Sequence, residues 1–177
     1  MTRETIPFEA LKVDIFNLWD NQWWVLSAGD FATGKYNSMT VSWGALGIMW
    51  NKPFVLVVVR PTRYTYQFIE NYSDFSLCTF NEKYRSALEY LGSHSGRNGD
   101  KIQSSGLTPQ AASNITAPLF EEAELCLECR KIYCADYDPK RFLDVRIEEL
   151  YPQKDYHRIY FGEVVAITGL AKYRAAC

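Results

Sequence analysis

Histidine is scarce in this sequence, and the usual catalytic arrangements are missing with it. Only His94 and His157 occur among 177 residues, so a hydrolytic triad would need one of them. No Ser or Cys lies in a supporting motif, and the central residue of GSHSG is His94, not the serine of a nucleophile elbow. The carboxylate clusters at 121–124 and 148–149 are typical of solvated faces. Hydrolytic and acid–base enzymes are therefore poorly supported.

Cysteine is also sparse, and its spacing does not indicate a metal site. Five cysteines, an odd number, suit reduced thiols in the cytosol better than a disulfide framework. Cys126 and Cys129 form the single CxxC pair, and residues three apart on one strand point to opposite faces. We therefore expect structural thiols and no metal. We expect Cys177 to lie in a frayed end.

Long hydrophobic runs and a charge excess are absent. The longest apolar run covers residues 54–59, far short of a membrane span, and the opening MTRETIPFEALKV lacks a signal-peptide pattern. Nineteen Lys and Arg against 21 Asp and Glu give a formal net charge of −2, which is not the basic balance of a nucleic-acid-binding protein. We predict a cytoplasmic protein that binds neither membranes nor nucleic acid.

What the sequence has in plenty is aromatic residues and strand patterns. There are 12 Tyr, 10 Phe and 5 Trp. Alternating or continuous apolar patterns predict strands over residues 22–28, 35–43, 54–59, 74–80, 124–137 and 159–173. A turn is predicted at Gly29 and Asp30, and an irregular segment over 108–118. Because strands outnumber helices and follow one another, we expect one mainly β domain, a closed or partly closed antiparallel barrel with helices at its ends.

Two helices are predicted in the middle of the chain. The first covers residues 64–72, with its apolar residues on one face and Thr62 as its N-cap. The second begins after Asn81, which acts as its cap, and ends at Gly92. The segment SHSGRNGDK, residues 93–101, is predicted to be a loop.

Two arginines, Arg60 and Arg63, flank the predicted start of the first helix. A helix N-terminus carries unpaired N–H groups and partial positive charge, so two cations there are unfavourable unless an anion lies between them. A phosphate would satisfy both arginines, the amides and the Thr62 hydroxyl. Two solvated surface arginines explain the same pattern, and taken alone the pattern favours them.

The loop over 93–101 also has features of an anion site. Gly96 and Gly99 let the backbone approach a ligand closely, Arg97 and Lys101 supply two cations, and serines add hydroxyls. The spacing is not that of a P-loop, and an ordinary Asn-Gly turn is the alternative.

The stretch 36–50 carries no charge, and over 36–43 small polar residues alternate with apolar ones. Such a strip suits a planar heteroaromatic ligand, whose rim Asn37, Ser38, Thr40 and Ser42 could bond. A half-exposed strand with polar residues facing water is equally compatible.

Four segments in order, NSMTVSWGALGIMWNKPFVLVVVRPTRYTYQFIE, DFSLCTF, SHSGRNGDK and YHRIYFGEV, strongly resemble the flavin reductase-like family of FMN-binding split barrels, and its flavoredoxin branch in particular. The resemblance covers roughly residues 18–172. It implies one domain over 1–177 with a Greek-key split β-barrel, which dimerises with FMN at the subunit interface.

The resemblance also implies site residues. The isoalloxazine ring would be lined by Asn37, Ser38, Met39, Thr40 and Val41. The phosphate would be surrounded by Arg60, Thr62, Arg63 and Tyr64, with Ser93, Gly96, Arg97 and Lys101 closing over it. His157 matches a family position near the reacting face, although its place before a strand also fits an exposed turn. Asn98 stands where some relatives carry an aspartate.

The function implied is an oxidoreductase that passes electrons between NADH or NADPH and an acceptor, which could be free flavin, a protein or a small molecule. The alternative is a flavoredoxin-like electron carrier that a protein partner reduces, with no NAD(P)H reaction of its own. The absence of a GxGxxG motif keeps this alternative open. A binding module for a planar ligand, without turnover, is a third reading.

Overall fold

The computed structural model describes residues 2–175. Its strands are β1 (Glu4–Thr5), β2 (Trp24–Asp30), β3 (Lys35–Val41), β4 (Gly44–Met49), β5 (Lys52–Val59), β6 (Asp74–Thr79), β7 (Pro109–Gln110), β8 (Leu119–Phe120), β9 (Leu125–Asp136) and β10 (Arg158–Gly169). Its α-helices are α1 (Ile15–Asn17), α2 (Tyr64–Asn71), α3 (Arg85–Ser93) and α4 (Lys101–Ser105). None of the helices in this part of the chain is long and apolar enough to span a membrane.

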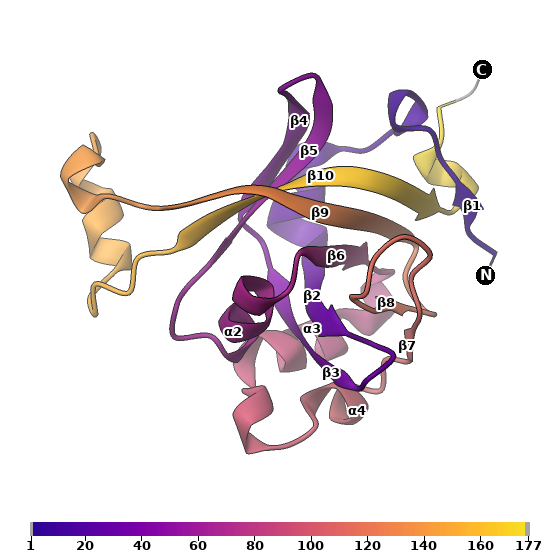
Figure 1. The fold of residues 1–177 in the computed structure, drawn as a ribbon, viewed down its shortest axis with the longest axis horizontal. Coiled ribbons are helices and arrows are strands. Elements are labelled where there is room, and N and C mark those ends of the chain that lie inside the picture. Colours follow the sequence, from indigo (N-terminus) through magenta and orange to yellow (C-terminus); the bar gives the residue numbers. More distant parts are fainter. Residues whose placement is uncertain (1, 176–177) are drawn as a thin grey trace.

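The main sheet is antiparallel and has the order β3-β2-β6-β9-β10-β5-β4, with β1 added to β10. Although β3 and β4 are neighbours in sequence, they lie at opposite ends of this order, and no ladder joins them within the described residues. Figure 1 shows β9 and β10 crossing the molecule, with the β4–β5 hairpin on one side and β2, β3 and β6 on the other. The sheet is therefore a barrel left open along one seam, as the strand pattern predicted.

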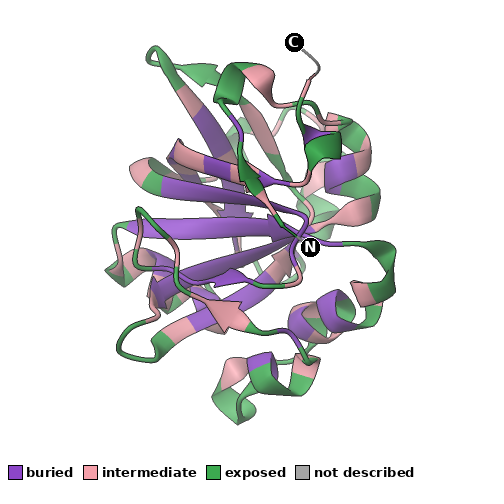
Figure 2. Cartoon of the chain, turned by 90° about the vertical axis from the view of Figure 1, so that its right-hand side faces the viewer, coloured by how far each residue is buried: buried purple, intermediate pink, exposed green. Residues whose placement is uncertain are grey.

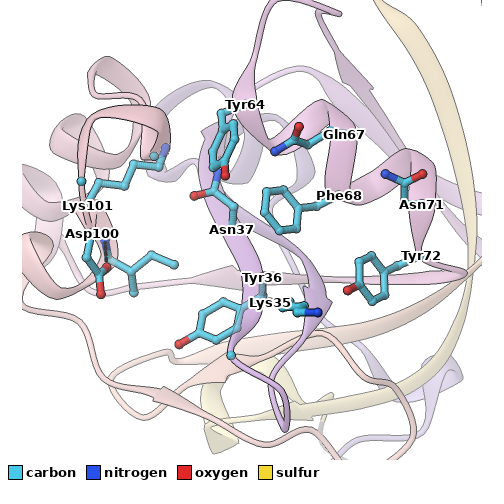
Figure 3. Close-up of a pocket in the computed structure, with 14 residues that line it drawn as sticks. Lys35, Tyr36, Asn37, Tyr64, Gln67, Phe68, Asn71, Tyr72, Asp100 and Lys101 are labelled. Atoms are coloured by element: carbon cyan, nitrogen blue, oxygen red, sulfur yellow. Dashed lines mark hydrogen bonds between the residues drawn. The ribbon is translucent and has the colours of Figure 1, made fainter.

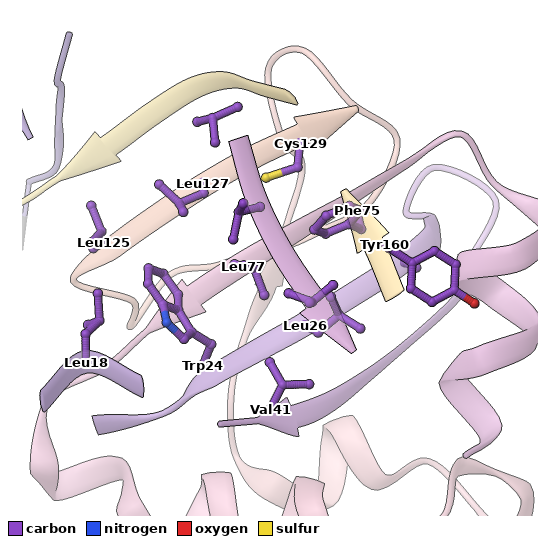
Figure 4. Close-up of a cluster of buried hydrophobic side chains, with 14 of the residues drawn as sticks. Leu18, Trp24, Leu26, Val41, Phe75, Leu77, Leu125, Leu127, Cys129 and Tyr160 are labelled. Carbon is purple, nitrogen blue, oxygen red and sulfur yellow. The ribbon is translucent and has the colours of Figure 1, made fainter. Parts of the chain in front are cut away.

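The barrel interior is one apolar cluster that draws on strands from both ends of the sheet. It contains Leu26 of β2, Val41 of β3, Val57 of β5, Leu77 of β6 and Leu127 of β9, and Figure 4 shows several of these side chains converging. The residues next to these on each strand point to the outer face of the sheet, because successive side chains of a strand alternate between its two faces. Figure 2 shows the resulting concentration of buried residues in the central strands.

The second core lies between the outer face of the sheet and the helices. Val25 of β2 packs there with Leu88 and Leu91 of α3, Ile102 of α4 and Cys126 of β9. Both faces of β2 are buried by these two cores, which explains why Trp24, Val25 and Leu26 are consecutive apolar residues.

Most predicted strands are present, with corrected ends. Gly29 and Asp30 belong to β2, and the turn follows at residues 31–34. The strand predicted to Trp43 ends at Val41, and a separate strand, β4, follows it. β10 stops at Gly169, and a short 3-10 helix, Ala171–Tyr173, replaces the predicted end of that strand.

The helix predictions need three corrections. The N-cap of α2 is Arg63, not Thr62. The second helix begins as a 3-10 turn that Asn81 caps, and α3 continues past Gly92 by one residue. The segment predicted as a plain loop contains a 3-10 turn and the start of α4, whose N-cap Asp100 accepts hydrogen bonds from two backbone amides.

Four cysteines lie in the described residues, and all are free thiols. Cys126 faces the outer core and Cys129 the barrel interior, as expected for residues three apart on one strand. Burial raises the pKa of Cys129 well above its usual value. No group of three or more His, Cys, Asp or Glu between residues 2 and 175 could hold a metal ion. Cys177 lies outside the described residues.

Residues 137–157, between β9 and β10, form a projection that we call the arm. It contains two 3-10 helices, Pro139–Arg141 and Val145–Leu150. Figure 1 shows the arm extending away from the rest of the fold, beyond the end of β9 and the start of β10. Its base returns to the body at His157, which places residues of the arm beside the seam of the barrel.

Candidate functional site

A cavity of about 240 Å³ lies at the seam of the barrel, and we call it the seam cavity. One wall comes from the end of β3 and the connection to β4, and the other from the end of β5 and from His157. The lining residues are Met39, Thr40, Val41, Ser42, Trp43, Val58, Arg60, Arg63 and His157. The edges of the sheet remain apart here, which leaves room for a ligand between them.

A second cavity, of about 100 Å³, adjoins the first and shares Met39 and Arg63 with it. We call it the cation cavity. Its remaining lining residues come from the start of α2, the end of α3 and the loop that follows: Thr62, Tyr64, Thr65, Leu91, Gly92, Ser93, His94, Ser95, Arg97 and Lys101. No carboxylate from the described part of the chain lines either cavity. The pair therefore joins an anion-binding end to an apolar and weakly polar end.

The three cations of the cation cavity bond peptide carbonyls and not carboxylates. Arg63 donates to Gly92 O at 3.1 Å and Arg97 donates to Thr62 O at 3.1 Å. Lys101 is 6% exposed and donates to the carbonyls of Leu91 (2.8 Å) and His94 (3.1 Å). Burial and the nearby Arg63 lower the pKa of Lys101 to about 8. These charges are held in place but not neutralised, which favours an anion.

Arg60 departs from the sequence prediction. Its guanidinium lies 2.7 Å from the Asp155 carboxylate and donates to Leu150 O at 2.9 Å. Thr62 donates to the same carboxylate at 3.3 Å. The Asp155 carboxylate, at the base of the arm, thus bonds Arg60 and Thr62, two of the residues that were predicted to bind a phosphate. The pairing with Arg60 holds the pKa of Asp155 below its usual range.

His157 lines the seam cavity and is partly buried. Its Nδ1 lies 2.8 Å from the Tyr151 hydroxyl, and its ring centroid is 5.2 Å from that of Trp43. Burial, followed by the nearby Arg60, lowers the pKa of His157 to about 4. His157 is therefore a neutral, hydrogen-bonded residue at pH 7, and the reading of it as an exposed turn residue is wrong.

Several polar side chains of β3 have hydrogen-bond partners within the chain. Asn37 donates to Thr65 Oγ1 at 2.6 Å, and Ser38 shares a 2.7 Å hydrogen bond with Ser27. The Thr40 hydroxyl donates to the Leu88 carbonyl. Asn37 and Ser38 are buried, so the reading of a strand whose polar residues face water is wrong for them. The expectation that these side chains bond a ligand rim stays a prediction. Among the described residues β3 pairs with β2 alone, so backbone groups on its free edge can also bond the ligand.

Gly96 does not line the cation cavity, and it packs instead against Asn37 and Tyr64. A Cβ at this position would lie 2.4 Å from Asn37 Oδ1 and 2.7 Å from a ring carbon of Tyr64. The loop thus closes tightly onto β3 and α2. Arg97 lies over the Tyr64 ring, with its guanidinium carbon 5.2 Å from the ring centroid, which fixes the loop from the other side.

A larger cavity, of about 770 Å³, lies on the opposite side of this closure and is shown in Figure 3. Gln67, Phe68, Asn71 and Tyr72 of α2 line it. Of the predicted site residues it contains only Asn37, Tyr64, Gly96 and Lys101. The structure therefore gathers most of the predicted residues in the smaller pair of cavities.

Sequence reasoning missed several residues of the site. Trp43 lies in the uncharged strip and could have been included on that signal, as Ser42 was. Thr65 and Ser95 flank predicted residues in the cation cavity. Asp155 belongs to no motif, and only the long-range return of the arm brings it to Arg60.

The geometry can be compared with known proteins. A family model described as a flavin reductase like domain matches residues 21–173. The chain belongs to the flavin reductase-like family. The family is one of flavoprotein oxidoreductases. No curated protein matches the chain.

Solved structures show the same fold. Flavoredoxin from Methanosarcina acetivorans is 21% identical, with a TM-score of 0.67 over 95% of this chain and 73% of that chain. Flavoredoxin of Desulfovibrio vulgaris is 21% identical, with a TM-score of 0.66 over 88% and 73%. An FMN-binding domain of a flavin reductases-like enzyme from Shewanella baltica is 17% identical, with a TM-score of 0.67 over 95% and 77%. The fold of this flavin reductase-like chain is the predicted split barrel.

Proposed function

We propose that the adjoining cavities hold FMN, with the phosphate in the cation cavity and the isoalloxazine ring in the seam cavity. The observation that carries this proposal is the charge of the lining: Arg63, Arg97 and Lys101 bond peptide carbonyls, and no carboxylate of the described residues lines either cavity. An FMN phosphate brings nearly two negative charges at pH 7. The FMN-binding domain among the structural neighbours supports the same cofactor.

The residues present fit this group. Arg63, Arg97 and Lys101 would hold the phosphate, and the free edge of β3 would offer backbone donors and acceptors to the ring. Met39 and Val58 line the seam cavity with apolar surface, which limits water around the ring. His157 is neutral at pH 7 and adds no positive charge there. When bound, flavin supplies the two-electron redox chemistry, and the chain binds, orients and shields it.

We further propose that NADH or NADPH reduces the bound flavin, and that the electrons pass onward to an acceptor. A flavoredoxin-like carrier, reduced by a protein partner, is the second candidate, which the two flavoredoxins among the structural neighbours favour. The free thiols agree with a reducing compartment such as the cytosol.

The test begins with the visible spectrum of the purified protein and a titration of the flavin-free chain with FMN. We expect a flavin spectrum and saturable binding; failure of FMN to bind would overturn the proposal. Anaerobic addition of NADH or NADPH should then bleach the flavin band. If both donors leave the band unchanged while a reduced ferredoxin bleaches it, the carrier reading replaces the reductase reading.

We also propose that two copies of the chain form a homodimer. The β4–β5 hairpin carries an exposed apolar surface, which we call the hairpin patch: Ile48, Met49 and Trp50. Ile48 is 63% exposed and Trp50 57%. Trp50 rests on Phe161 at a centroid distance of 5.8 Å. Contiguous exposed apolar side chains mark interaction surfaces, and in a twofold dimer the same patch of both copies would meet.

A further inference from the structure

A further cavity, of about 690 Å³, lies where the arm meets the barrel, and we call it the arm cavity. Five aromatic side chains form much of its wall: Trp43, Tyr133, Tyr137, Phe142 and Tyr151. Phe142 and Tyr151 lie nearly parallel, 12° apart with centroids separated by 6.0 Å. Ala135, Ile147 and Leu150 add apolar surface. Flat walls of this kind favour a flat ligand, and the volume lies in the range of small-molecule sites.

The charged groups of the arm cavity are already paired. The Asp136 carboxylate lies 2.7 Å from Arg158, and Asp138 lies 3.4 Å from Arg141. Asp138 also caps the first 3-10 helix of the arm by accepting from the Lys140 amide. The lining therefore carries two carboxylates and one arginine, each with a partner of opposite charge, and an anion would meet a net negative wall. The lining selects an uncharged molecule.

The arm cavity adjoins the seam cavity. Trp43 lines both cavities. Tyr151 lines the arm cavity, and its hydroxyl meets the Nδ1 of His157, which lines the seam cavity. A ligand in the arm cavity would thus be separated from the seam cavity by a single layer of side chains.

We propose that the arm cavity binds the oxidising substrate of this protein, a flat, uncharged, conjugated oxidant of one or two rings such as a para-quinone. This inference rests on the proposed function for its source of electrons. The quinone would receive two electrons from the reduced flavin across this layer of side chains. It would take two protons from water and leave as the hydroquinone, while the flavin would release its proton to water and return to its oxidised form.

The experiment measures binding directly on the full chain. Flavin-free protein is titrated with 1,4-naphthoquinone, and the heat of binding is recorded. Ile147→Trp fills the arm cavity, and Glu149→Trp, on the same 3-10 helix but exposed and absent from the lining, is the matched control. We expect Ile147→Trp to weaken naphthoquinone binding about tenfold or more, a change worth about 1.4 kcal/mol, and Glu149→Trp to leave it unchanged.

The anionic 1,4-naphthoquinone-2-sulfonate tests the class of ligand. We expect it to bind about tenfold more weakly than the uncharged quinone. Equal or tighter binding of the sulfonate would overturn the assignment to uncharged molecules. Absence of naphthoquinone binding, or equal losses in the two variants, would overturn the site itself, including the case in which a partner subunit fills the cavity.

A parallel titration with FMN separates this inference from the proposed function. Neither variant touches the seam or cation cavity, so both should bind FMN like the unmodified chain. Quinone binding without FMN binding would keep the arm cavity as a ligand site but remove its role as the acceptor site. FMN binding without quinone binding would leave the proposed function and remove the inference.

Discussion

Lys101 is a buried cation whose charge depends on pH in the working range. Its ammonium group bonds two carbonyls and contacts no carboxylate. Burial and Arg63 lower its pKa to about 8, so a rising share of the residue is neutral above that pH. A phosphate dianion would favour the charged form, and binding would therefore take up a proton.

The prediction is that FMN affinity falls about tenfold between pH 7 and pH 9, as the free protein loses the Lys101 proton. The phosphate is already a dianion over this range. Fluorescence titrations at each pH would measure the slope. In Lys101→Gln the affinity should be lower at pH 7 and nearly independent of pH. An equally steep profile in this variant would assign the titration to another group.

Arg63 and Arg60 look equivalent in sequence but differ in their partners. Arg63 bonds only a carbonyl among the described residues and lines both cavities, whereas Arg60 is paired with Asp155. Arg63→Ala should therefore weaken FMN binding by about one to two orders of magnitude and change riboflavin binding little. Arg60→Ala serves as the comparison and should cost less in FMN affinity. The reverse ranking would contradict the phosphate assignment.

At the scale of elements, the site depends on how the loop after α3 closes onto β3 and α2. Gly96 sits at the point of closest approach, and α4 begins directly after the loop and holds Lys101 at its first position. A shift of this loop would move Arg97 and Lys101 together.

We predict that Gly96→Ala lowers the free energy of unfolding by about 1–3 kcal/mol, since the added Cβ overlaps Asn37 and Tyr64. It should weaken FMN binding as well. Urea denaturation and FMN titration measure the two effects. Gly92→Ala is the matched control, because its Cβ would lie 3.3 Å from Thr40 and needs only a small adjustment. Equal costs for the two substitutions would show that the closure is loose.

At the scale of the whole molecule, the hairpin patch and the arm both carry apolar side chains into solvent. The arm adds Leu143, which is 99% exposed, and Val145, which is 81% exposed. A partner copy would bury such surface, and stable interfaces gain most of their energy from apolar burial.

We predict that the unmodified chain is a dimer by light scattering. Trp50→Glu should be a monomer, because a buried unpaired charge in the interface is costly. Phe16→Glu, at an equally apolar position on α1 that is 83% exposed, should remain a dimer. A monomeric unmodified chain that binds FMN tightly would contradict the dimer while leaving the cofactor proposal intact.

The sequence by itself determined the local features of this protein. The continuous apolar pattern predicted β2, and the period of a strand predicted that Cys126 and Cys129 of β9 face opposite ways, as they do. Clustering in the chain placed Met39, Thr40 and Val41 together, and Thr62, Arg63 and Tyr64 together. These features depend on neighbours in sequence, and side-chain period and residue type are enough to read them.

Only the tertiary structure decided which distant groups meet. Arg60 and Asp155 are 95 positions apart, and the partners of Ser38 and Asn37 come from β2 and α2. A periodic pattern specifies the face on which a side chain lies, but it does not specify the strand or arm that packs against that face. The charge balance of the cation cavity and the aromatic walls of the arm cavity therefore exist only in the folded chain, where barrel closure brings these segments together.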